Sequence, residues 1–305
     1  MTSAALVVGL GSIGRRHARL LGELGLEVAA VSRRADAAPR CYASLGEALA
    51  RETPGYVVVA NETSAHRASL AALAEAGFSG TVLVEKPLFA EPAPLPENRF
   101  AGLYVGYNLR FHPLLAELKR LLAVEPALSA QIYVGQYLPD WRPGRDYRAT
   151  ASATRAAGGG VLRDLSHELD YMRWLFGPCR QVAALSGRSG ALDIDSEDVA
   201  ALLLAFERCP VATLQLNYLD RPGAREIVVN TAHRTLRADL RRGSLHLDGE
   251  VRLFPAARDD TYLAQHRSAL GNRREALCTA EEGAAAVALI AAAEQAAASG
   301  AWVAP

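Results

Sequence analysis

The sequence predicts a two-part α/β protein. Residues 1–124 are expected to form a doubly wound parallel sheet, and residues 125–305 an open, mainly antiparallel sheet with helices on one face. Short apolar runs alternate with helical patterns in the first part, as in consecutive β–α units. A glycine-rich turn directly follows the first of these runs. In the second part, several runs alternate between apolar and polar residues, as strands with one covered face do.

The composition is typical of a soluble globular protein. Half of the 305 residues are apolar, 22% are charged, and the formal net charge is zero. This balance gives no electrostatic basis for binding nucleic acid or an anionic membrane. No apolar run approaches the roughly 20 residues of a membrane span, and the N-terminal run is typical of a buried strand, not of a signal peptide. The scattered cysteines predict free thiols in a reducing cytoplasm and no metal site.

The first part is predicted to be a series of strands and helices. Strands are expected at Ala4–Val8, Glu27–Val31, Tyr56–Ala60, Thr81–Val84 and Gly102–Val105. Helices are expected at 15–25, Leu45–Arg51, Ser64–Ala76 and Phe111–Val124. Prolines between residues 91 and 96 are incompatible with a helix interior, so the last crossover is expected to lack its helix.

The turn Gly9–Gly14 has the spacing of a dinucleotide-binding loop. Gly9 would make the tight turn, Gly11 would let the backbone approach a pyrophosphate, and Gly14 would let the following helix pack closely on the strand. The free N–H groups at the helix N-terminus favour an anion. Because the motif stands between a strand and a helix, it predicts a nucleotide cofactor.

The residues after the second strand indicate which cofactor binds. NAD-binding proteins usually have an acidic residue there, which binds the ribose 2′-hydroxyl. This sequence has Ser32, Arg33 and Arg34 instead, with no carboxylate before Asp36. A hydroxyl and two guanidinium groups suit a 2′-phosphate, which favours NADP over NAD. Alternatively, the two arginines are solvated or stack on the adenine.

Lys86 follows the strand Thr81–Val84 within the segment Glu85-Lys86-Pro87. A lysine at the carboxyl end of a parallel strand points toward the crevice where such sheets bind ligands. Lys86 is therefore a candidate for binding a substrate oxygen and for acid–base chemistry. The alternative is an ordinary loop lysine.

The segment Gly158–Gly177 predicts an amphipathic helix after three glycines. One stripe is apolar and suits a core, namely Leu165, Leu169, Met172 and Phe176. The opposite stripe is ionisable and aromatic and suits a cleft, namely His167, Tyr171 and Trp174. Asp164 is either part of that second stripe or the N-cap of a surface helix on which His167 is merely solvated.

A loop at 137–148 combines two tyrosines, a tryptophan and three arginines, as a sugar with a carboxylate or phosphate would require. The alternative is a structural loop packed over the sheet. The acidic residues between Asp193 and Asp198 lack the spacing of a calcium loop and are interpreted as a solvated strand entry.

The rest of the second part consists mainly of strands. They are expected at Ala130–Gly135, Val182–Leu185, Val199–Phe206, Val211–Asn217, Glu226–Asn230, Thr235–Ala238 and Ser244–Leu247. An alanine-rich helix at Thr279–Ala298 is expected to close the chain.

Together, the motifs resemble those of the glucose–fructose oxidoreductase/inositol dehydrogenase (Gfo/Idh/MocA) family. The matching segments are GLGSIG, EKP at 85–87, GYNLRFHP at 106–113 and the GGG…D…H…D…W…G run at 158–177. The resemblance implies a Rossmann domain and a sheet domain, with cofactor and sugar meeting between them. The step from Asp164 to His167 is one residue shorter than usual in the family. The DLSHELDY version is similar to members found with bacterial surface-polysaccharide or sialic-acid-like sugar genes.

The resemblance also implies the function and the site. The expected reaction is hydride transfer between nicotinamide and a hydroxyl or ketone of a sugar or nucleotide-sugar. Alternatives are a non-catalytic nucleotide sensor and NAD-assisted glycoside hydrolysis or elimination. A homodimer or homotetramer through the second sheet is expected. Candidate catalytic residues are Lys86, His167 and Asp164. Candidate cofactor ligands are Gly9, Gly11, Ser12, Ile13, Gly14, Ser32, Arg33, Arg34, Asn61, Glu85 and Lys86. Candidate substrate ligands are Tyr107, Asn108, Arg110, Trp141, Tyr147 and Asp170.

Overall fold

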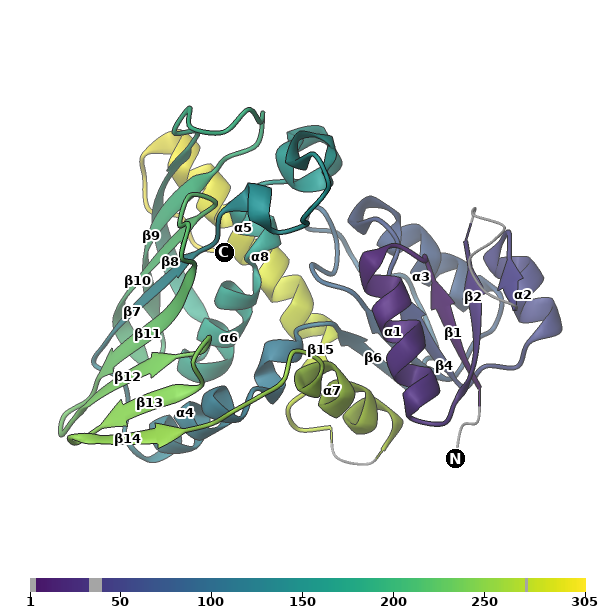
Figure 1. Cartoon of the computed structure of the whole chain (residues 1–305), viewed down its shortest axis with the longest axis horizontal. Helices are drawn as coiled ribbons and strands as arrows, with labels where there is room; N and C mark the ends of the chain where they lie inside the picture. The colour runs from purple at the N-terminus through teal and green to yellow at the C-terminus, as the bar shows by residue number, and fades with distance from the viewer. Residues whose placement is uncertain (1–3, 33–39, 272–273) are drawn as a thin grey trace. The chain divides into compact units, whose positions relative to one another are not determined.

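The computed structural model describes residues 4–32, 40–271 and 274–305 (Figure 1). The chain forms two compact units, residues 1–111 with 257–284, and residues 112–256 with 285–305. The sequence placed the boundary after residue 124. The difference arises because helix α4 (Pro113–Val124) belongs to the second unit, and a later segment returns to the first.

The first unit is built on a seven-stranded sheet in the order β15-β6-β5-β4-β1-β2-β3. All pairs are parallel except β6 with β15. This confirms the predicted doubly wound sheet. The strands are β1 (Ala4–Val8), β2 (Glu27–Val31), β3 (Cys41–Tyr42), β4 (Tyr56–Val59), β5 (Thr81–Val84), β6 (Gly102–Val105) and β15 (Cys278–Thr279).

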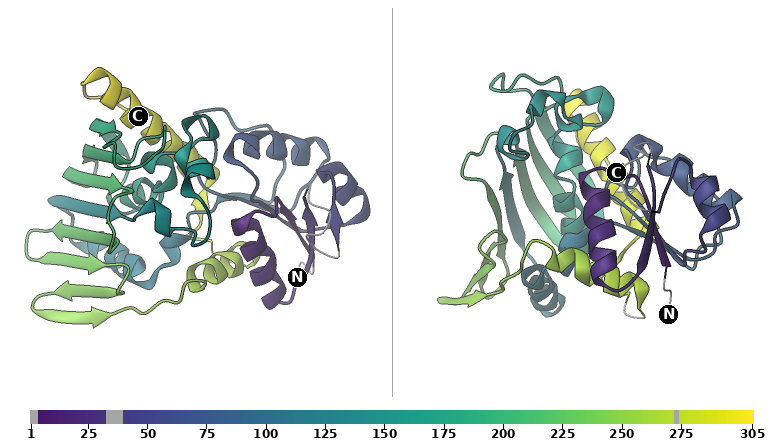
Figure 2. Two further views of the ribbon diagram at one scale, coloured as in Figure 1. Left: turned by 45° about the horizontal axis from the view of Figure 1, so that its top comes forward. Right: turned by 45° about the vertical axis from the view of Figure 1, so that its right-hand side comes forward.

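Helices cover both faces of this sheet, with α1 and α3 on opposite sides (Figure 2). Because both faces are covered, β4 is completely buried and reads as a continuous apolar run. As predicted, the proline-rich segment between β5 and β6 contains no helix. The helices are α1 (Ser12–Glu23), α2 (Leu45–Arg51), α3 (His66–Glu75) and α7 (Asp260–Leu270), with 3-10 segments η1 (Thr63–Ala65) and η2 (Asn108–Phe111). The sequence prediction missed α7.

The second unit contains an eight-stranded sheet in the order β14-β13-β12-β11-β7-β10-β9-β8. Only β7 and β10 pair in parallel, so the predicted mainly antiparallel sheet is confirmed. The strands are β7 (Ser129–Gly135), β8 (Cys179–Gly187), β9 (Val199–Phe206), β10 (Cys209–Asn217), β11 (Ala224–Asn230), β12 (Thr235–Asp239), β13 (Ser244–Leu247) and β14 (Glu250–Leu253).

The two faces of this sheet differ in chemistry. Alternate residues such as Leu202, Leu204 and Leu214 are buried beneath the helices, whereas Leu185 and Leu203 are 76% and 40% exposed on the other face. Figure 1 shows α4 and α6 on the buried side. This is the one-sided covering that the alternating pattern predicted. The unit also contains α8 (Ala280–Ser299), which starts in the first unit, and 3-10 segments η3 (Leu138–Asp140), η4 (Tyr147–Ala149), η5 (Ala151–Ala153) and η6 (Arg155–Ala157).

The predicted helix at 158–177 is interrupted. It consists of α5 (Val161–Asp164) and α6 (His167–Phe176), separated by Leu165 and Ser166. The expected cleft-facing stripe is also wrong for Tyr171, which is fully buried. Helix α6 packs on several sides, so its periodicity does not separate a core face from an open face.

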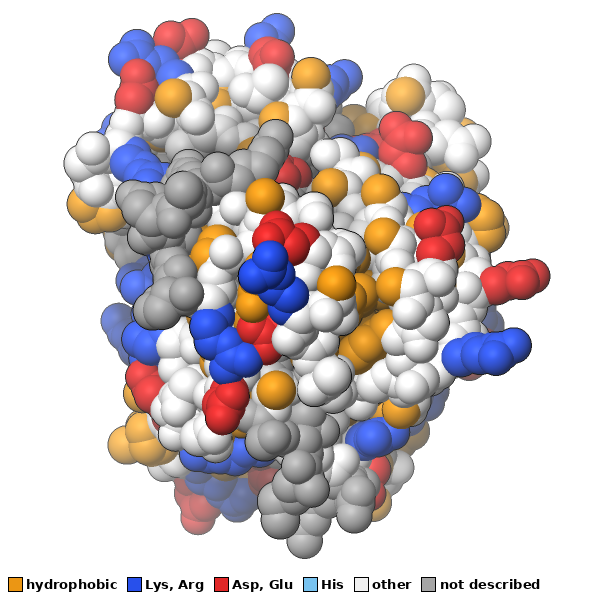
Figure 3. All heavy atoms as spheres, turned by 90° about the vertical axis from the view of Figure 1, so that its right-hand side faces the viewer, with side chains coloured by type: hydrophobic (Ala, Val, Ile, Leu, Met, Phe, Trp, Pro, Cys, Tyr) orange, Lys and Arg blue, Asp and Glu red, His pale blue; other side chains and the backbone are white. Residues whose placement is uncertain are grey.

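Among the described residues, no helix is long and apolar enough to cross a membrane. The surface seen in Figure 3 carries interspersed acidic and basic side chains. This distribution agrees with the zero net charge of the chain.

Candidate active site

The glycine turn of the first unit is shaped by close packing. Gly9 has a φ of +95°, and a Cβ atom there would lie 2.7 Å from Cα of Asn61. A Cβ atom on Gly14 would lie 1.8 Å from the carbonyl oxygen of Gly9. At Gly11, by contrast, no heavy atom lies within 4 Å of the Cβ position. The two outer glycines therefore hold the turn, and the middle one leaves room for a ligand at the N-terminus of α1.

The turn lies where the strand order of the sheet reverses. Strand β1 stands between β2 and β4, so residues after β1 and after β4 flank the crevice in which open α/β sheets bind ligands. Asn61 follows β4 and donates from Nδ2 to Ser69 Oγ at 2.9 Å. Its buried Oδ1 atom has no donor in the described part of the chain. An open glycine, a helix N-terminus and an unused amide oxygen fit a dinucleotide.

The structure places Ser32 directly after β2, where its backbone N–H donates to the carbonyl of Tyr42 at 3.0 Å. Arg33 and Arg34 lie outside the described residues. Their part in cofactor choice stays a prediction.

Lys86 lies at the carboxyl end of β5, as predicted. Its backbone N–H donates to Glu85 Oε2 at 3.0 Å, and the other carboxylate oxygen lies 2.8 Å from His17 Nε2. Burial raises the pKa of the Glu85 carboxyl, but the hydrogen bond from His17 and the nearby charge of Lys86 outweigh it and lower that pKa below its usual value. Glu85 is therefore a buried carboxylate that holds the turn carrying Lys86. No pattern in the sequence indicated His17.

Three predicted substrate ligands after β6 are buried in the first unit. Asn108 donates to Thr261 Oγ1 at 2.6 Å, and Arg110 pairs with Glu282 at 2.8 Å. Tyr107 is fully buried. These contacts join the segment to α7 and to the start of α8. All three residues are therefore packed within the first unit. Their contact with substrate stays a prediction.

Asp164 is the last residue of α5, and Ser166 occupies the N-cap position of α6. The interpretation of Asp164 as an N-cap is therefore wrong. Its Oδ2 atom accepts a 2.6 Å hydrogen bond from the hydroxyl of Tyr218, whose ring meets Trp141 edge-on at 5.2 Å. Burial, with the charge of Asp164, raises the pKa of the Tyr218 phenol. The structure thus joins two predicted site residues through a tyrosine that the sequence did not indicate.

Glu197 holds the N-terminus of α5. Its backbone carbonyl accepts from Val161 N–H at 3.2 Å, and its Oε1 atom accepts from Leu162 N–H at 3.4 Å. Gly160 has a φ of +120°, and a Cβ atom there would lie 2.1 Å from the same carboxylate oxygen. The glycine is required because the carboxyl group approaches the backbone here. Burial raises the pKa of Glu197.

The acidic patch is only partly solvated, which corrects the expectation for it. Asp193 and Asp195 are exposed, but Glu197 and Asp198 are buried. Asp198 accepts from the N–H and the hydroxyl of Ser189, both at 2.7 Å. The patch therefore fixes loops beside α5.

His167 is the first residue of α6 and is partly exposed, whereas Asp170, one turn later, is buried. Between them, the completely buried Glu168 pairs with Arg225 of β11 at 3.0 Å. A buried charge is costly unless it is paired, so this contact fixes α6 on the sheet and with it the position of His167. The sequence prediction missed Glu168 because it treated the apolar and aromatic stripes as the informative positions.

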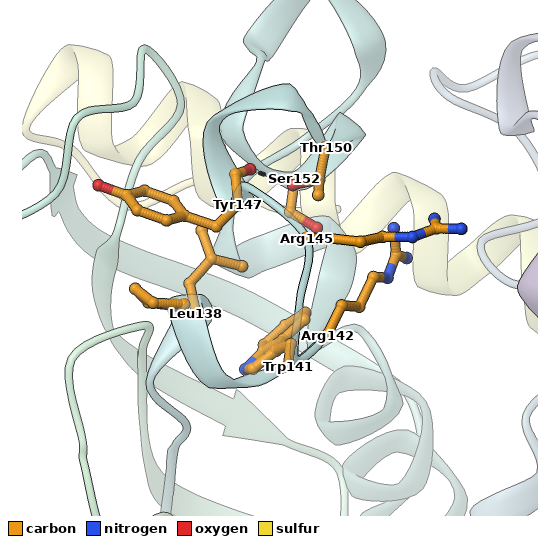
Figure 4. A pocket seen from close by; sticks show the side chains of 8 residues that line it. Leu138, Trp141, Arg142, Arg145, Tyr147, Thr150 and Ser152 are labelled. Atoms are coloured by element: carbon orange, nitrogen blue, oxygen red, sulfur yellow. Dashed lines mark hydrogen bonds between the residues drawn. The ribbon is translucent and has the colours of Figure 1, made fainter.

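The arginine-rich loop is anchored by its aromatic residues. The hydroxyl of Tyr147 accepts from Asp193 N–H at 3.2 Å. Figure 4 shows Arg142 and Arg145 extending to one side of the loop and Tyr147 to the other. Neither arginine has an ion-pair partner within the described ranges, whereas Arg148 pairs with Asp146 at 2.9 Å. The cavity between these residues measures about 10 Å³, which holds one water molecule and not a sugar ring.

Two family models match the chain. Residues 4–97 match the oxidoreductase family with an NAD-binding Rossmann fold, and residues 128–244 match the GFO/IDH/MocA C-terminal domain. Together these segments cover well over half of the chain. The chain belongs to the Gfo/Idh/MocA family of oxidoreductases. The resemblance found in its motifs is thereby confirmed, and its first unit is an NAD-binding Rossmann fold.

Solved structures have the same fold. GenD2 from gentamicin A biosynthesis, in complex with NAD, is 24% identical, with a TM-score of 0.82 over 100% of this chain and 96% of that chain. WlbA dehydrogenase from Bordetella pertussis, with NADH and UDP-GlcNAcA, is 20% identical, with a TM-score of 0.80 over 100% and 99%. UDP-N-acetylglucosamine 3-dehydrogenase GnnA from Acidithiobacillus ferrooxidans is 21% identical, with a TM-score of 0.78 over 96% and 97%. A search of curated proteins finds no match.

Because burial raises the pKa of Glu197 in the folded protein, its contribution to the stability of the fold should depend on pH. A carboxyl whose pKa is higher in the folded state than in the unfolded state stabilises the fold below its unfolded pKa, and this contribution is lost as the pH rises through its folded pKa. Glu197→Gln keeps an acceptor for Leu162 N–H but cannot ionise. We expect the melting temperature of the wild type to fall relative to Glu197→Gln as the pH rises from 4 to 8.

Thermal unfolding followed by circular dichroism measures this difference. The exposed Glu207→Gln is the matched control for loss of one carboxylate. A difference between wild type and Glu197→Gln that is constant across the pH range contradicts the assignment.

Proposed function

We propose that this oxidoreductase transfers hydride between a nicotinamide cofactor and a secondary hydroxyl or ketone of a sugar or nucleotide-sugar. The observation that supports it most is the set of groups around the strand-order reversal. Gly11 leaves open space at the N-terminus of α1, Asn61 offers an amide oxygen after β4, and Lys86 follows β5. The solved structures with the same fold support the substrate class, since two of them are named as UDP-sugar enzymes or complexes.

Gly9–Gly14, Asn61 and the turn at Lys86 would hold the cofactor, whose nicotinamide ring would supply the hydride acceptor for oxidation and the hydride donor for reduction. His167 accepts the hydroxyl proton when the alcohol is oxidised and returns it when a ketone is reduced, because an imidazole has the best-suited ordinary pKa. The Lys86 ammonium binds a substrate oxygen and stabilises its developing charge. Asp164, which accepts a hydrogen bond from Tyr218, is the third proposed catalytic residue.

The loop at 137–148 favours an anionic substrate. Arg142 and Arg145 extend from one side of it, and a guanidinium binds carboxylate or phosphate oxygens bidentately. Trp141 and Tyr147 offer faces for a sugar ring or a base. The substrate panel for the tests below therefore includes nucleotide-sugars, sugar acids and neutral sugars.

Removal of the proposed acid–base residues is expected to abolish most turnover. Lys86→Met and His167→Asn should each lower kcat by about 10²- to 10⁴-fold, the usual contribution of a positioned acid or base. Binding of the dinucleotide, measured by protein fluorescence, should change much less. Turnover is followed by the absorbance of the reduced nicotinamide.

His246→Asn, on the exposed surface of β13, is the matched control and should retain wild-type turnover. A wild type that binds the cofactor but turns over no substrate in the panel would favour a nucleotide sensor. Product formed without net change in nicotinamide would favour NAD-assisted hydrolysis or elimination.

We propose that NADP is preferred over NAD, on the basis of Ser32, Arg33 and Arg34 in the sequence. Arg33→Asp should weaken NADPH binding by at least about tenfold and shift the preference toward NADH, because the carboxylate repels a 2′-phosphate. Titration of both cofactors, with Arg99→Asp as a control for charge alone, measures the shift. An unchanged ratio of the two affinities makes Arg33 a bystander.

We also propose a homodimer or homotetramer formed through the outer sheet face. Leu203 lies opposite Ala183 and Thr213 on neighbouring strands, and Leu185 follows on the same face. A row of small and apolar residues suits close contact with a second copy. The four cysteines are free thiols, and on that basis we place the protein in the cytoplasm.

Leu203→Asp should weaken the assembly by at least about tenfold, because it would bury a charge at the proposed interface. Sedimentation velocity over a range of concentrations measures the mass. Val124→Asp, at an 82% exposed position at the end of α4, is the control and should leave the mass unchanged. A monomeric wild type, or an unaltered Leu203→Asp oligomer, contradicts the proposal.

A further inference from the structure

A chain of four hydrogen-bonded side chains runs through the interior of the first unit. The hydroxyl of Tyr56 lies 3.0 Å from His266 Nδ1, and His266 Nε2 lies 2.9 Å from His17 Nδ1. His17 Nε2 then lies 2.8 Å from Glu85 Oε1. The residues come from β4, α7, α1 and the end of β5. This hydrogen-bond chain therefore connects α1, the helix after the glycine turn, with the turn that carries Lys86.

All four side chains are buried. Tyr56, His17 and His266 have no exposed surface, and Glu85 is 7% exposed. Solvent is therefore not available to complete their hydrogen bonding, and each group depends on its neighbours in the chain. Because an imidazole has two distinct nitrogens, these neighbours also decide which nitrogen carries the proton.

The groups at the two ends of this hydrogen-bond chain determine which atom donates in each hydrogen bond. Glu85 is ionised, as its lowered pKa indicates, and accepts from His17 Nε2–H and from the Lys86 backbone N–H. Burial lowers the pKa of His266 well below that of an ordinary imidazole, so this ring is neutral. If Tyr56 donates to His266 Nδ1, then His266 Nε2–H donates to His17 Nδ1, and His17 Nε2–H donates to Glu85. Every hydrogen then has one acceptor.

The reversed order leaves one hydrogen without an acceptor. With a proton on both nitrogens of His17, His266 Nε2 would have to accept and His266 Nδ1–H would donate to the oxygen of Tyr56. The hydroxyl hydrogen of Tyr56 would then need another acceptor. Within the described ranges, His266 is the only hydrogen-bond partner of that hydroxyl. The order from Tyr56 to Glu85 is therefore the one that satisfies the buried groups.

We propose that His17 and His266 are positioning residues for Lys86, acting through a hydrogen-bond chain whose donors all point toward the Glu85 carboxylate. His266 fixes the tautomer of His17, and His17 fixes Glu85. Glu85 in turn holds the backbone N–H of Lys86. The role rests on the proposed function of Lys86, whereas the proton order of the chain does not.

Helix α7 supplies His266, and further contacts fix its place on α1. Arg19 pairs with Asp259 at 2.5 Å, and the guanidinium of Arg16 lies 5.2 Å from the centroid of the Tyr262 ring. The ring of Tyr262 also meets His17 edge-on at 5.7 Å. These contacts hold His266 within reach of His17. They account for the return of residues 257–284 to the first unit.

Nitrogen NMR of the full-length protein, labelled at histidine, tests the proton order without any substrate. His17 and His266 should both be neutral near pH 7 with the proton on Nε2, and their signals are assigned with His17→Asn and His266→Asn. A doubly protonated His17, or the Nδ1–H tautomer at either ring, overturns the proposed order of donors from Tyr56 to Glu85. Tyr104→Phe removes a phenol elsewhere in the same sheet and should leave both tautomers unchanged.

Two substitutions at His17 separate positioning from simple packing. The side-chain amide of Gln reaches the place of Nε2 and can still donate to Glu85, whereas that of Asn reaches the place of Nδ1 and can only meet His266. Each variant breaks one buried link, so both should lower the melting temperature. We expect His17→Gln to stay within about threefold of the wild-type kcat and His17→Asn to lose about tenfold or more, because a misplaced catalytic group is costly.

Equal losses of kcat in the two variants, or losses that follow the melting temperature, overturn the positioning role. Cofactor binding and Lys86→Met are measured alongside. If Lys86→Met retains wild-type turnover, the proposed function of Lys86 fails, and the positioning role fails with it while the NMR result stands separately. If Lys86→Met is inactive and the two His17 variants behave alike, only the positioning role fails.

Discussion

The contact between Gly14 and the carbonyl of Gly9 sets the geometry of the first unit. A methyl group at Gly14 would lie 1.8 Å from that oxygen, so α1 approaches the end of β1 only because no side chain intervenes. The same approach directs the N-terminus of α1 toward the open space at Gly11. It also places His17, one turn along α1, beside Glu85. Helix packing, the direction of α1 toward the open space at Gly11 and the support of the Lys86 turn thus depend on one close backbone contact.

Sequence patterns predicted the strands better than the helices of the site. The predicted bounds are correct for β1, β2, β5, β6, β9 and β13. Each is a run of mainly apolar residues, and the turn residues on either side limit where the strand can begin and end. The interruption between α5 and α6 was not predictable, since Glu197 caps α5 from a distant loop. Helix α7 was missed because His266 and Gln265, polar in sequence, are buried.

The type and position of a residue were enough to predict it as a site residue, but they did not indicate its partners. Lys86 and His167 stand out because lysine and histidine follow a strand end and begin a helix. Tyr218, which binds Asp164, lies 54 residues away in the chain, and His266, which contacts His17, lies 249 residues away. No local pattern carries such pairings. The sequence motif predicts Arg110 as a substrate ligand, whereas in the structure Arg110 is buried and pairs with Glu282.

Each unit contains a buried carboxyl group, and the pKa values of the two groups shift in opposite directions. Glu85 meets an imidazole donor and lies near the Lys86 ammonium, which together outweigh burial and keep it ionised. Glu197 meets mainly backbone N–H groups, and burial therefore dominates and favours its protonated form. A charged Glu85 can anchor a chain of donors that all point one way, and a neutral carboxyl could not. Glu197 needs only to accept a backbone N–H at the start of a helix of four residues, which a carboxyl oxygen can do in either protonation state.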